Sequence, residues 1–348
     1  MPTIITIGNT YLKKKGQVRP TDHYEILNIN SANGKPVNYA VTFRITEACD
    51  LACSYCDWHG GKHYKFESII TSIDRLFEFF QKQKFKAVVF YYHGGEATRH
   101  PRVVEILKHI KDKSKETGIV AYNEMQTNLT IGENKLKDIL EHCDLLNITF
   151  HYLELKKREY KLRAFNRNFQ ELINMQQPIH NFDVMLEYVP EEFINEFRES
   201  VENYLNYDKI ENSEMIYGFG YNQEDYNEKT YAQHLEFYNK YNKTDQQYKI
   251  DGKIYTTNQM FRVGLDCTGW WCGAGTESIT INGDGNVYNC GIHMTNNVNG
   301  QYDTPFTNLV DDKMAINKMA VLYRTGTQCR WDYCGGDFYL EKAKVRPE

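Results

Sequence analysis

Three cysteines on one short stretch are the residues of this chain best suited to chemistry. Cys49, Cys53 and Cys56 are separated by three and by two residues. Soft thiolate ligands suit iron–sulfur clusters, whose potentials are tuned by hydrogen bonding and burial. Three thiolates hold three irons of a [4Fe–4S] cube and leave the fourth iron open to a substrate or cosubstrate. The spacing therefore predicts a cluster with an open iron.

A structural zinc site is the main alternative for this stretch. Such sites usually have paired Cys-x-x-Cys or Cys/His sets and four ligands, and the nearest further candidates are His59 and His63. A disulfide framework is disfavoured, because nothing marks the chain as secreted. The first residues lack a basic region followed by a long apolar core, so no signal peptide is expected. We expect a cytoplasmic protein whose thiols stay reduced.

A second motif follows an apolar run further along the chain. Residues 86–92 read as a buried strand, and Gly94, Gly95 and Glu96 come shortly after it. Glycines let a backbone approach a ligand closely, since they have no side chain. Glu96 adds an acceptor for an ammonium group. An ordinary turn after a strand is the alternative, but the position after the three-cysteine stretch favours a binding role.

The two motifs together resemble the signature of the radical S-adenosylmethionine (SAM) superfamily. Tyr55, just before the last cysteine, is part of that signature. In the family, the residues that match Gly94, Gly95 and Glu96 bind the amino group of the SAM methionine. The resemblance covers roughly residues 38–345 and implies a SAM-dependent oxidoreductase or modifying enzyme. A reduced cluster passes one electron to SAM, which breaks into methionine and a 5′-deoxyadenosyl radical, and that radical takes a hydrogen atom from the substrate.

Strand-like runs alternate with helical patterns from about residue 38 onward. The expected strands are 39–45, 87–92, 119–126, 145–152, 183–189 and 215–220, and the expected helices are 68–82, 102–115, 134–142, 165–175 and 191–205. Such alternation predicts an α/β fold, with a parallel sheet and right-handed crossovers. Six such units resemble the partial (β/α)6 TIM-like barrel of the radical SAM core. Ligand sites gather at the carboxyl ends of such strands, and both motifs are expected there.

Two further strand ends carry residues that the resemblance assigns to SAM. Residues 126–130 resemble the Thr-Asn-Gly found after the third strand, with Leu129 in place of the glycine. Asn128 is the expected partner of a ribose or methionine group, and an asparagine that holds its own turn is the alternative. After the fourth strand, Thr149 and His151 take the place where relatives often use a serine toward SAM.

A basic residue is also expected near the SAM carboxylate. Arg163 or Lys161 suits this role, and arginine binds carboxylates through two parallel hydrogen bonds. The alternative is that most of the charged side chains in residues 156–161 lie on a solvent-exposed face of a helix.

Five cysteines fall in the last quarter of the chain: Cys267, Cys272, Cys290, Cys329 and Cys334. Residues 277–289 alternate polar and apolar around Asn-Gly-Asp-Gly-Asn, which predicts a β-hairpin that brings Cys272 and Cys290 together. Cys329 and Cys334 supply two more thiolates, and four thiolates complete the shell of a second [4Fe–4S] cluster. A four-cysteine structural zinc is the alternative.

This arrangement resembles the Twitch domain, the shorter form of the SPASM domain that follows many radical SAM barrels. Cys272, Gly285 and Cys290 fit the family spacing of a cysteine, nine to fifteen residues, a glycine, four residues and a cysteine. The pair that follows is spaced more widely than the usual Cys-x-x-Cys. Cys267 is not needed for this set of four ligands. The alternatives for it are a buried structural residue, a replacement for one of the proposed ligands, or a donor of a hydrogen atom to a substrate radical, as in some radical SAM epimerases.

The expected organisation has four parts. They are an N-terminal extension over 1–37, the barrel over 38–240, a linker over 241–260 and a small cysteine-rich domain, built of a hairpin and a short helix, over 261–348. In the extension, the β-like runs 4–7 and 24–29 are expected to form a hairpin that covers a sheet edge.

Composition narrows the partners. The formal charge of −5 suggests no nucleic-acid surface, and no stretch approaches the roughly 18 apolar residues of a membrane span. The resemblance implies an electron donor such as flavodoxin or ferredoxin.

We expect modification of ribosomally made peptides, with the second cluster assisting electron transfer. The alternatives are dehydrogenation or epimerisation of a small molecule such as a sugar, aminocyclitol or nucleotide, and, in another class, a zinc-stabilised binding protein without catalysis.

Overall fold

The computed structural model describes most of the chain. The described residues are 4–7, 10–13, 21–27, 37–53, 56, 61–186, 193–217, 240, 247–256, 260, 265–290, 304–329, 334 and 342–344.

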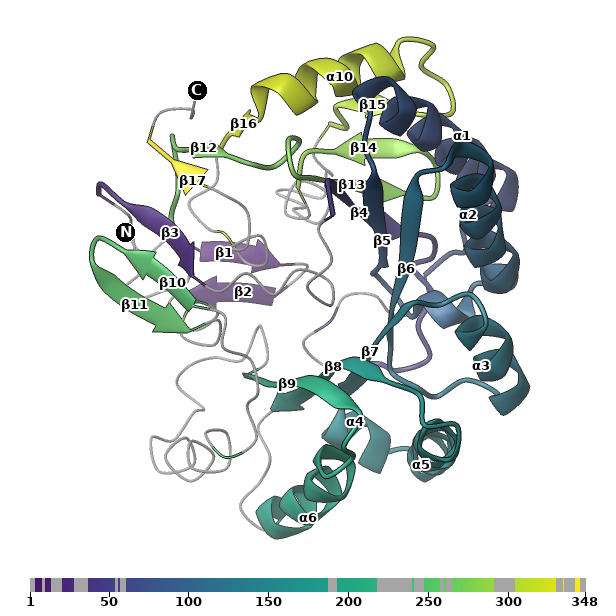
Figure 1. Cartoon of the computed structure of the whole chain (residues 1–348). Coiled ribbons are helices and arrows are strands. Elements are labelled where there is room, and N and C mark those ends of the chain that lie inside the picture. The colour runs from purple at the N-terminus through teal and green to yellow at the C-terminus, as the bar shows by residue number, and fades with distance from the viewer. Residues whose placement is uncertain are drawn as a thin grey trace.

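A nine-stranded sheet forms the centre of the described part, in the order β15-β14-β13-β4-β5-β6-β7-β8-β9. Its parallel strands are β4 (Tyr39–Arg44), β5 (Ala87–Tyr92), β6 (Val120–Thr127), β7 (Leu145–Phe150), β8 (Ile179–Leu186) and β9 (Ile210–Tyr217). The sheet curves, with helices on its outer side (Figure 1). The predicted α/β fold and partial TIM-like barrel are therefore confirmed.

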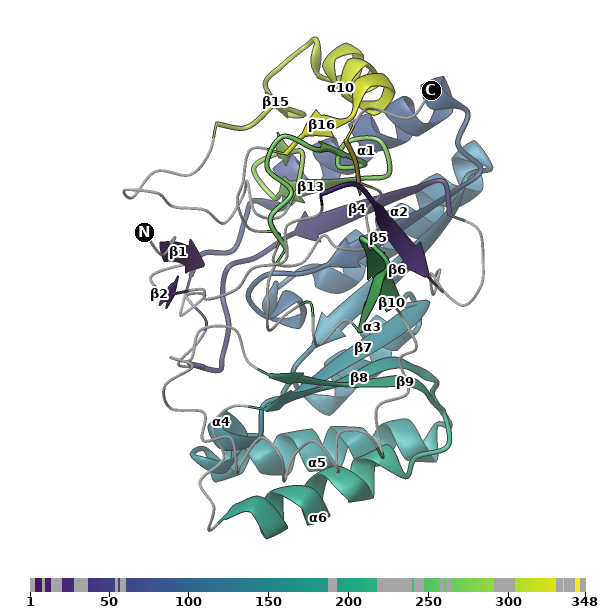
Figure 2. The ribbon, with the colours of Figure 1, turned by 90° about the vertical axis from the view of Figure 1, so that its left-hand side faces the viewer.

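The helices follow the strands in alternation. They are α1 (Phe66–Gln83), α2 (Val103–Thr117), α3 (Glu133–Leu140), α4 (Tyr152–Lys156), α5 (Glu159–Asn174) and α6 (Ile194–Leu205), with the short 3-10 turn η2 (Ala97–Arg99) after β5. Figure 2 shows α5 and α6 beside β8 and β9 at one end of the sheet. Strands β8 and β9 begin four and five residues earlier than expected, since polar side chains at their starts hide the apolar pattern.

Aromatic side chains fill the core between the sheet and its outer helices. Phe80 of α1 is fully buried, and its ring centroid lies 5.6 Å from that of Phe77, 5.9 Å from that of Phe85 and 6.0 Å from that of Phe90 on β5. Edge-to-face and tilted pairs of this kind add to the stabilisation that comes from buried area. This cluster holds α1 against the strands that carry the two sequence motifs.

Replacing Phe80 with alanine is expected to lower the free energy of unfolding by about 3–5 kcal/mol, because it removes a large buried ring and leaves a cavity. Val321→Ala on the surface of helix α10 (Ala315–Thr325) is the matched control, since that side chain is 58% exposed and its loss is expected to cost under about 0.5 kcal/mol. Urea unfolding of both variants measures the difference. Equal midpoints would contradict this description of the core.

The C-terminal region extends the barrel sheet. Strands β13 (Ser278–Asn282) and β14 (Asn286–Tyr288) form the predicted hairpin, with Thr280 opposite Tyr288. β13 pairs in parallel with β4, and β15 (Thr307–Asn308) continues the sheet. The expected short helix is α10 (Ala315–Thr325), which packs against α1 (Figure 1). The expected cysteine-rich region is thus joined to the barrel by main-chain hydrogen bonds.

The N-terminal extension pairs differently from the expectation. β1 (Ile4–Ile7) pairs with β2 (Thr10–Lys13), whereas β3 (Tyr24–Leu27) pairs with β10 (Gln247–Ile250), which continues into β11 (Lys253–Thr256). The expected hairpin between residues 4–7 and 24–29 is therefore not formed. Residues 241–260, expected to be a linker, carry the β10–β11 hairpin instead.

The turn between β10 and β11 explains this arrangement. Asp251 and Gly252 have φ angles of 47° and 86°, as a type I′ hairpin turn requires. The Asp251 carboxylate accepts hydrogen bonds from the backbone N–H groups of Thr21 (2.7 Å), Asp22 (2.9 Å) and His23 (2.9 Å), which fixes the entry to β3. These bonds lower the pKa of Asp251.

Among the described helices, none is long and apolar enough to cross a membrane.

Candidate active site

The three-cysteine loop follows β4 at the carboxyl end of the sheet. Cys49, Cys53 and Cys56 all lie in this loop, where Cys53 is buried and the Cys56 N–H donates to the Cys53 carbonyl at 3.0 Å. Thr46 steadies the start of the loop, since its Oγ1 accepts a hydrogen bond from the Ala48 N–H at 3.0 Å. Burial raises the pKa of Cys49 to about 12, and the charges of Glu96 and Cys56 add to the rise. Tyr55 lies outside the described residues.

The two glycines after β5 pack against the end of β4 and the start of this loop. Gly94 and Gly95 have φ angles of 90° and 55°, in the left-handed region that favours glycine. A Cβ on Gly95 would lie 2.7 Å from the Ala48 carbonyl oxygen, and a Cβ on Gly94 would overlap the Arg44 side chain. The next residue, Glu96, donates its backbone N–H to the same Ala48 carbonyl at 2.8 Å. Gly95 is therefore needed to position the cysteine loop, and Gly94 leaves room for the Arg44 side chain.

Glu96 connects the ends of β5 and β6. Its side chain is buried; one carboxylate oxygen accepts from the N–H and hydroxyl of Thr98, and the other accepts from the Asn128 N–H at 2.7 Å. Burial raises the pKa of Glu96, against the lowering effect of these hydrogen bonds. The carboxylate is thus placed at the rim, beside the cysteine loop.

The loop after β6 contacts the cysteine loop through Asn128. Its Nδ2 donates to Asp50 Oδ1 at 3.1 Å and lies 4.0 Å from Cys49 Sγ. Leu129, which stands where the family pattern has glycine, has a φ of 56°. It therefore adopts the left-handed conformation that glycine takes most readily, so the backbone fits the pattern even though the residue differs.

Asp50 is a central residue of the site that the motifs did not reveal. Besides Asn128, it accepts hydrogen bonds from Thr130 Oγ1 (2.8 Å) and Lys161 Nζ. Burial acts to raise the pKa of Asp50, but these hydrogen bonds outweigh it and hold the pKa below its usual value. The only sequence signal for this role is a carboxylate placed inside the cysteine loop.

The two basic residues predicted to lie near the SAM carboxylate, Lys161 and Arg163, occupy different environments. Lys161 on α5 is buried and forms an ion pair with Asp50. Arg163 lies on the outside of α5, where its side chain is 66% exposed and pairs with Glu159 at 2.7 Å. Arg163 is therefore not among the residues that meet at the rim.

Thr149 and His151 lie at the carboxyl end of β7. Thr149 Oγ1 accepts from Gln126 Nε2 at 3.0 Å, and Gln126 in turn accepts from the Tyr91 hydroxyl. His151 Nδ1 lies 3.7 Å from Cys53 Sγ, and burial lowers the pKa of His151 to about 4. The structure therefore brings Glu96, Asn128 and His151 to the cysteine loop from three neighbouring strands.

Asn168 on α5 supports the loop after β6. It is fully buried, and its Nδ2 donates to the carbonyls of Leu129 (2.9 Å) and Ile131 (2.7 Å). This residue stands far from both motifs in the sequence, so pattern alone does not reveal it.

Replacing Asn168 with alanine is expected to destabilise the protein by about 1–3 kcal/mol, because buried carbonyls lose their donor, and to weaken SAM binding as the Asn128 loop shifts. Asn174→Ala on the exposed end of the same helix is the control and is expected to change neither property. Thermal unfolding and SAM titration measure both effects. Unchanged SAM affinity in Asn168→Ala would contradict the supporting role.

The C-terminal cysteines are gathered by backbone pairing. β12 (Trp271–Cys272) pairs with β16 (Thr327–Gln328) and with β17 (Lys342–Ala343). The Cys329 N–H donates to the Trp270 carbonyl at 2.8 Å, and the Cys334 N–H donates to the Leu265 carbonyl at 2.7 Å. Residues from the end of the chain therefore lie against residues 265–272.

Cys267 lies among the predicted ligands of the second cluster. It is fully buried, and burial raises the pKa of its thiol. Lys342 opposes this rise, whereas the nearby thiols of Cys334, Cys329 and Cys272 add to it. Cys290, at the far end of the hairpin, packs against the cluster of Cys272 and Ala274. Cys267 thus lies near Cys272, Cys329 and Cys334, and Cys290 lies near Cys272.

Both cysteine groups have the donor chemistry of iron–sulfur clusters, since each offers three or more thiols from adjoining backbone segments. All nine cysteines lie within the described residues, and none forms a disulfide. Among those residues, no three His, Cys, Asp or Glu side chains converge as closely as the ligands of one metal ion.

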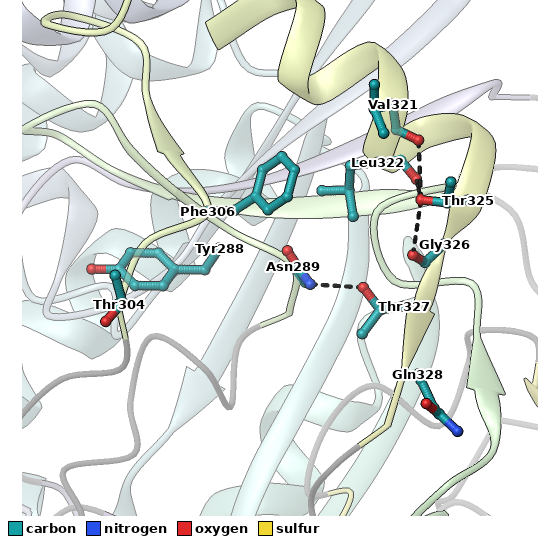
Figure 3. Close-up of a pocket in the computed structure, with 10 residues that line it drawn as sticks. All are labelled: Tyr288, Asn289, Thr304, Phe306, Val321, Leu322, Thr325, Gly326, Thr327 and Gln328. Carbon is teal, nitrogen blue, oxygen red and sulfur yellow. Dashed lines mark hydrogen bonds between the residues drawn. The ribbon is translucent and has the colours of Figure 1, made fainter.

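A separate pocket of about 420 Å³ lies beside α10. Figure 3 shows Phe306 and Leu322 on its apolar side and a hydrogen bond of 2.7 Å from Asn289 Nδ2 to Thr327 Oγ1. None of the predicted site residues lines it, although Cys290 directly follows Asn289.

Solved structures with the same fold are found among SAM-binding proteins. The crystal structure of Streptococcus suis SuiB bound to S-adenosylmethionine matches with a TM-score of 0.54 and 12% identity, over 82% of this chain and 66% of SuiB. Hexahistidine-tagged anSMEcpe with bound AdoMet matches with a TM-score of 0.51 and 15% identity, over 81% of this chain and 82% of that one. This chain thus spans just under two thirds of SuiB. At these identities the likeness shows the fold.

No curated protein is close enough in sequence to count as a relative. The family model described as the radical SAM superfamily matches residues 43–226, which is more than half of the chain and includes the cysteine loop, Glu96, Asn128 and His151. The chain belongs to the radical SAM superfamily.

Proposed function

We propose that this radical SAM enzyme modifies a peptide and uses a second iron–sulfur cluster in its C-terminal region to assist electron transfer. The peptide assignment is supported by SuiB, whose structure bound to the precursor peptide SuiA matches this chain with a TM-score of 0.50 and 12% identity. The observation that carries the enzyme assignment is the convergence of the cysteine loop, Glu96 and Asn128 at one rim, through the hydrogen bonds at Ala48 and Asp50.

In this proposal Cys49, Cys53 and Cys56 hold the first cluster, which supplies the electron that cleaves SAM. The chain's own residues position the reactants. Glu96 accepts the SAM ammonium group, Asn128 bonds its ribose or methionine, and Thr149 and the neutral His151 border the same space. Positioning within a site that excludes water is the main contribution of a protein to cofactor chemistry.

The second cluster is assigned to Cys272, Cys290, Cys329 and Cys334. Cys267 lies near three of these thiols, which supports it as a replacement for one of the four ligands. Four thiolates leave no open iron, which favours a role in electron transfer. When bound, this cluster would supply a one-electron acceptor for the substrate radical; with the loss of one proton to solvent, the substrate would then lack two hydrogens in all.

Metal analysis and mass spectrometry test the proposal. Protein reconstituted without oxygen is expected to carry about eight irons per chain, and a Cys272→Ser/Cys334→Ser double variant about four. Four irons in the unmodified protein would remove the second cluster. A peptide that loses two hydrogens on incubation with the enzyme, SAM and a reductant supports peptide modification, and turnover confined to sugars or nucleotides would contradict it.

A further inference from the structure

The inner face of the barrel carries a polar layer that the SAM-related residues do not use. Alternate residues of a strand face opposite sides of a sheet. On β7 and β8, Phe150 and Phe182 pack toward Phe165 and Phe169 of helix α5. Asn147 and Asp183 occupy the alternate positions and therefore face the inside of the barrel.

Two carboxylates meet in this layer. Burial raises the pKa of Asp183 on β8 to about 7, and the charge of Glu124 on β6 adds to this rise. Burial likewise raises the pKa of Glu124. Both charges also act on the Tyr91 hydroxyl from β5. Glu124 lies below the rim, because it precedes Asn128 by four residues, and Asp183 stands opposite Thr149 in the β7–β8 register.

One buried acceptor of the layer has no donor. Asn147 of β7 is 3% exposed and donates its Nδ2 to Glu124 Oε1 at 2.7 Å. Its own Oδ1 is buried and has no hydrogen-bond donor. Within the described part of the chain, no hydrogen bond or ion pair reaches Asp183. His180 acts to lower the pKa of Glu124, but its ring already bonds Glu211 at 3.0 Å.

Such an arrangement is costly unless a donor completes it. A buried amide oxygen without a donor opposes folding, and carboxylates inside a barrel are stabilised by a cation. Asn147 Oδ1 is the buried acceptor here, whereas the Glu124 and Asp183 side chains are half-buried. Three acceptor groups from three adjacent strands (Glu124 Oε2, Asn147 Oδ1 and the Asp183 carboxylate) match the three N–H donors of one ammonium group. A neutral hydroxyl would supply a single donor and no charge.

We propose that Glu124, Asn147 and Asp183 form a binding site for a primary ammonium group at the end of an alkyl chain, as in a lysine side chain. The identification of the bound molecule as the substrate rests on the proposed function. Glu124 and Asn147 lie on the amino-terminal side of Thr149 and His151, and Asp183 stands opposite Thr149 in the sheet register, so a substrate held there by its ammonium group extends toward the rim.

A pair of ligands that differ only in this group tests the proposal. Nα-acetyl-lysine methylamide and Nα-acetyl-norleucine methylamide share their backbone and alkyl chain, and calorimetric titration into the reconstituted full-length protein measures their affinities. The lysine compound is expected to bind about tenfold or more tightly than the norleucine compound. Equal affinities, or no binding of the lysine compound, would overturn the proposal without any variant.

Variants locate the site. Glu124→Gln and Asp183→Asn are each expected to reduce this preference about tenfold or more, whereas Glu133→Gln, which removes an exposed carboxylate on α3, is expected to keep it. An undiminished preference in both Glu124→Gln and Asp183→Asn would overturn the assignment.

Release of 5′-deoxyadenosine from SAM by the unmodified protein is scored separately. Ammonium binding without SAM cleavage overturns the proposed function and leaves the binding site standing. Cleavage without a preference for the lysine compound overturns the binding site alone.

Discussion

Replacing Cys53 with serine is expected to abolish SAM cleavage and to remove about four irons per chain. Serine is a harder and far less acidic ligand than a thiolate, and the loop offers no other thiol to replace it. The effect on activity is expected to be complete, because two protein ligands do not retain a site-differentiated cubane. Iron and sulfide analysis, together with release of 5′-deoxyadenosine in the presence of SAM and dithionite, measures the result.

Cys143→Ser is the matched control for this substitution. Cys143 lies before β7, where its Sγ contacts the carbonyls of Leu145 (3.2 Å) and Asn123 (3.8 Å), and a serine hydroxyl keeps a donor at that position. Its iron content and SAM cleavage are expected to match the unmodified protein. SAM cleavage by Cys53→Ser at the normal rate would end the assignment of the first cluster.

Replacing Gly95 with alanine is expected to lower SAM cleavage about tenfold or more, because it displaces the cysteine loop. The new Cβ would lie 2.7 Å from the Ala48 carbonyl oxygen and from the Glu47 carbonyl carbon, and both belong to backbone that leads into the cluster ligands. The left-handed φ of 55° adds a strain of about 1 kcal/mol for any residue with a Cβ.

Gly118→Ala is the control that separates the steric clash of the new Cβ from the strain of a left-handed φ angle. Gly118 has a similar φ of 70° at the end of α2, but a Cβ there meets nothing within 4 Å. This control is expected to lose about 1 kcal/mol of stability and to keep its SAM cleavage. Thermal unfolding and the 5′-deoxyadenosine assay are run on both variants. Equal activities would show that Gly95 does not seat the loop.

The barrel could be predicted from sequence because each of its elements has a local signal. Apolar runs such as 87–92 are bounded by helical patterns of ordinary length, and the structure places β5 at these residues. The turn Asp251-Gly252 also has a local signal, but the polar residues around it led to the interpretation of a linker. Pairing of β3 with β10 joins segments more than two hundred residues apart, and no local pattern specifies that partner.

Some residues of the candidate site can likewise be predicted from sequence and others cannot. Cys49, Gly95 and Glu96 stand in motifs that can be read from a few adjacent residues. Asp50 and Asn168 act through partners on other elements, and single polar residues of this kind occur throughout the chain. Their roles depend on which loops the barrel brings together, so they follow from the structure alone.

The C-terminal cysteines show a third case. The hairpin over 278–288 was predictable from its alternation and its Asn-Gly-Asp-Gly turn, and the structure contains it. The parallel pairing of β13 with β4 could not be predicted, because a strand that adds to a sheet edge shows the same alternation whichever edge it joins. The position of Cys267 beside Cys329 and Cys334 depends on pairing across sixty or more residues.

Release of 5′-deoxyadenosine is the measurement that tests the central claim most directly. Protein reconstituted with iron and sulfide without oxygen is mixed with SAM and dithionite, and the products are separated by chromatography. The account predicts 5′-deoxyadenosine and methionine in equal amounts from the unmodified protein and none from Cys53→Ser. An unmodified protein that binds zinc and leaves SAM intact would contradict it.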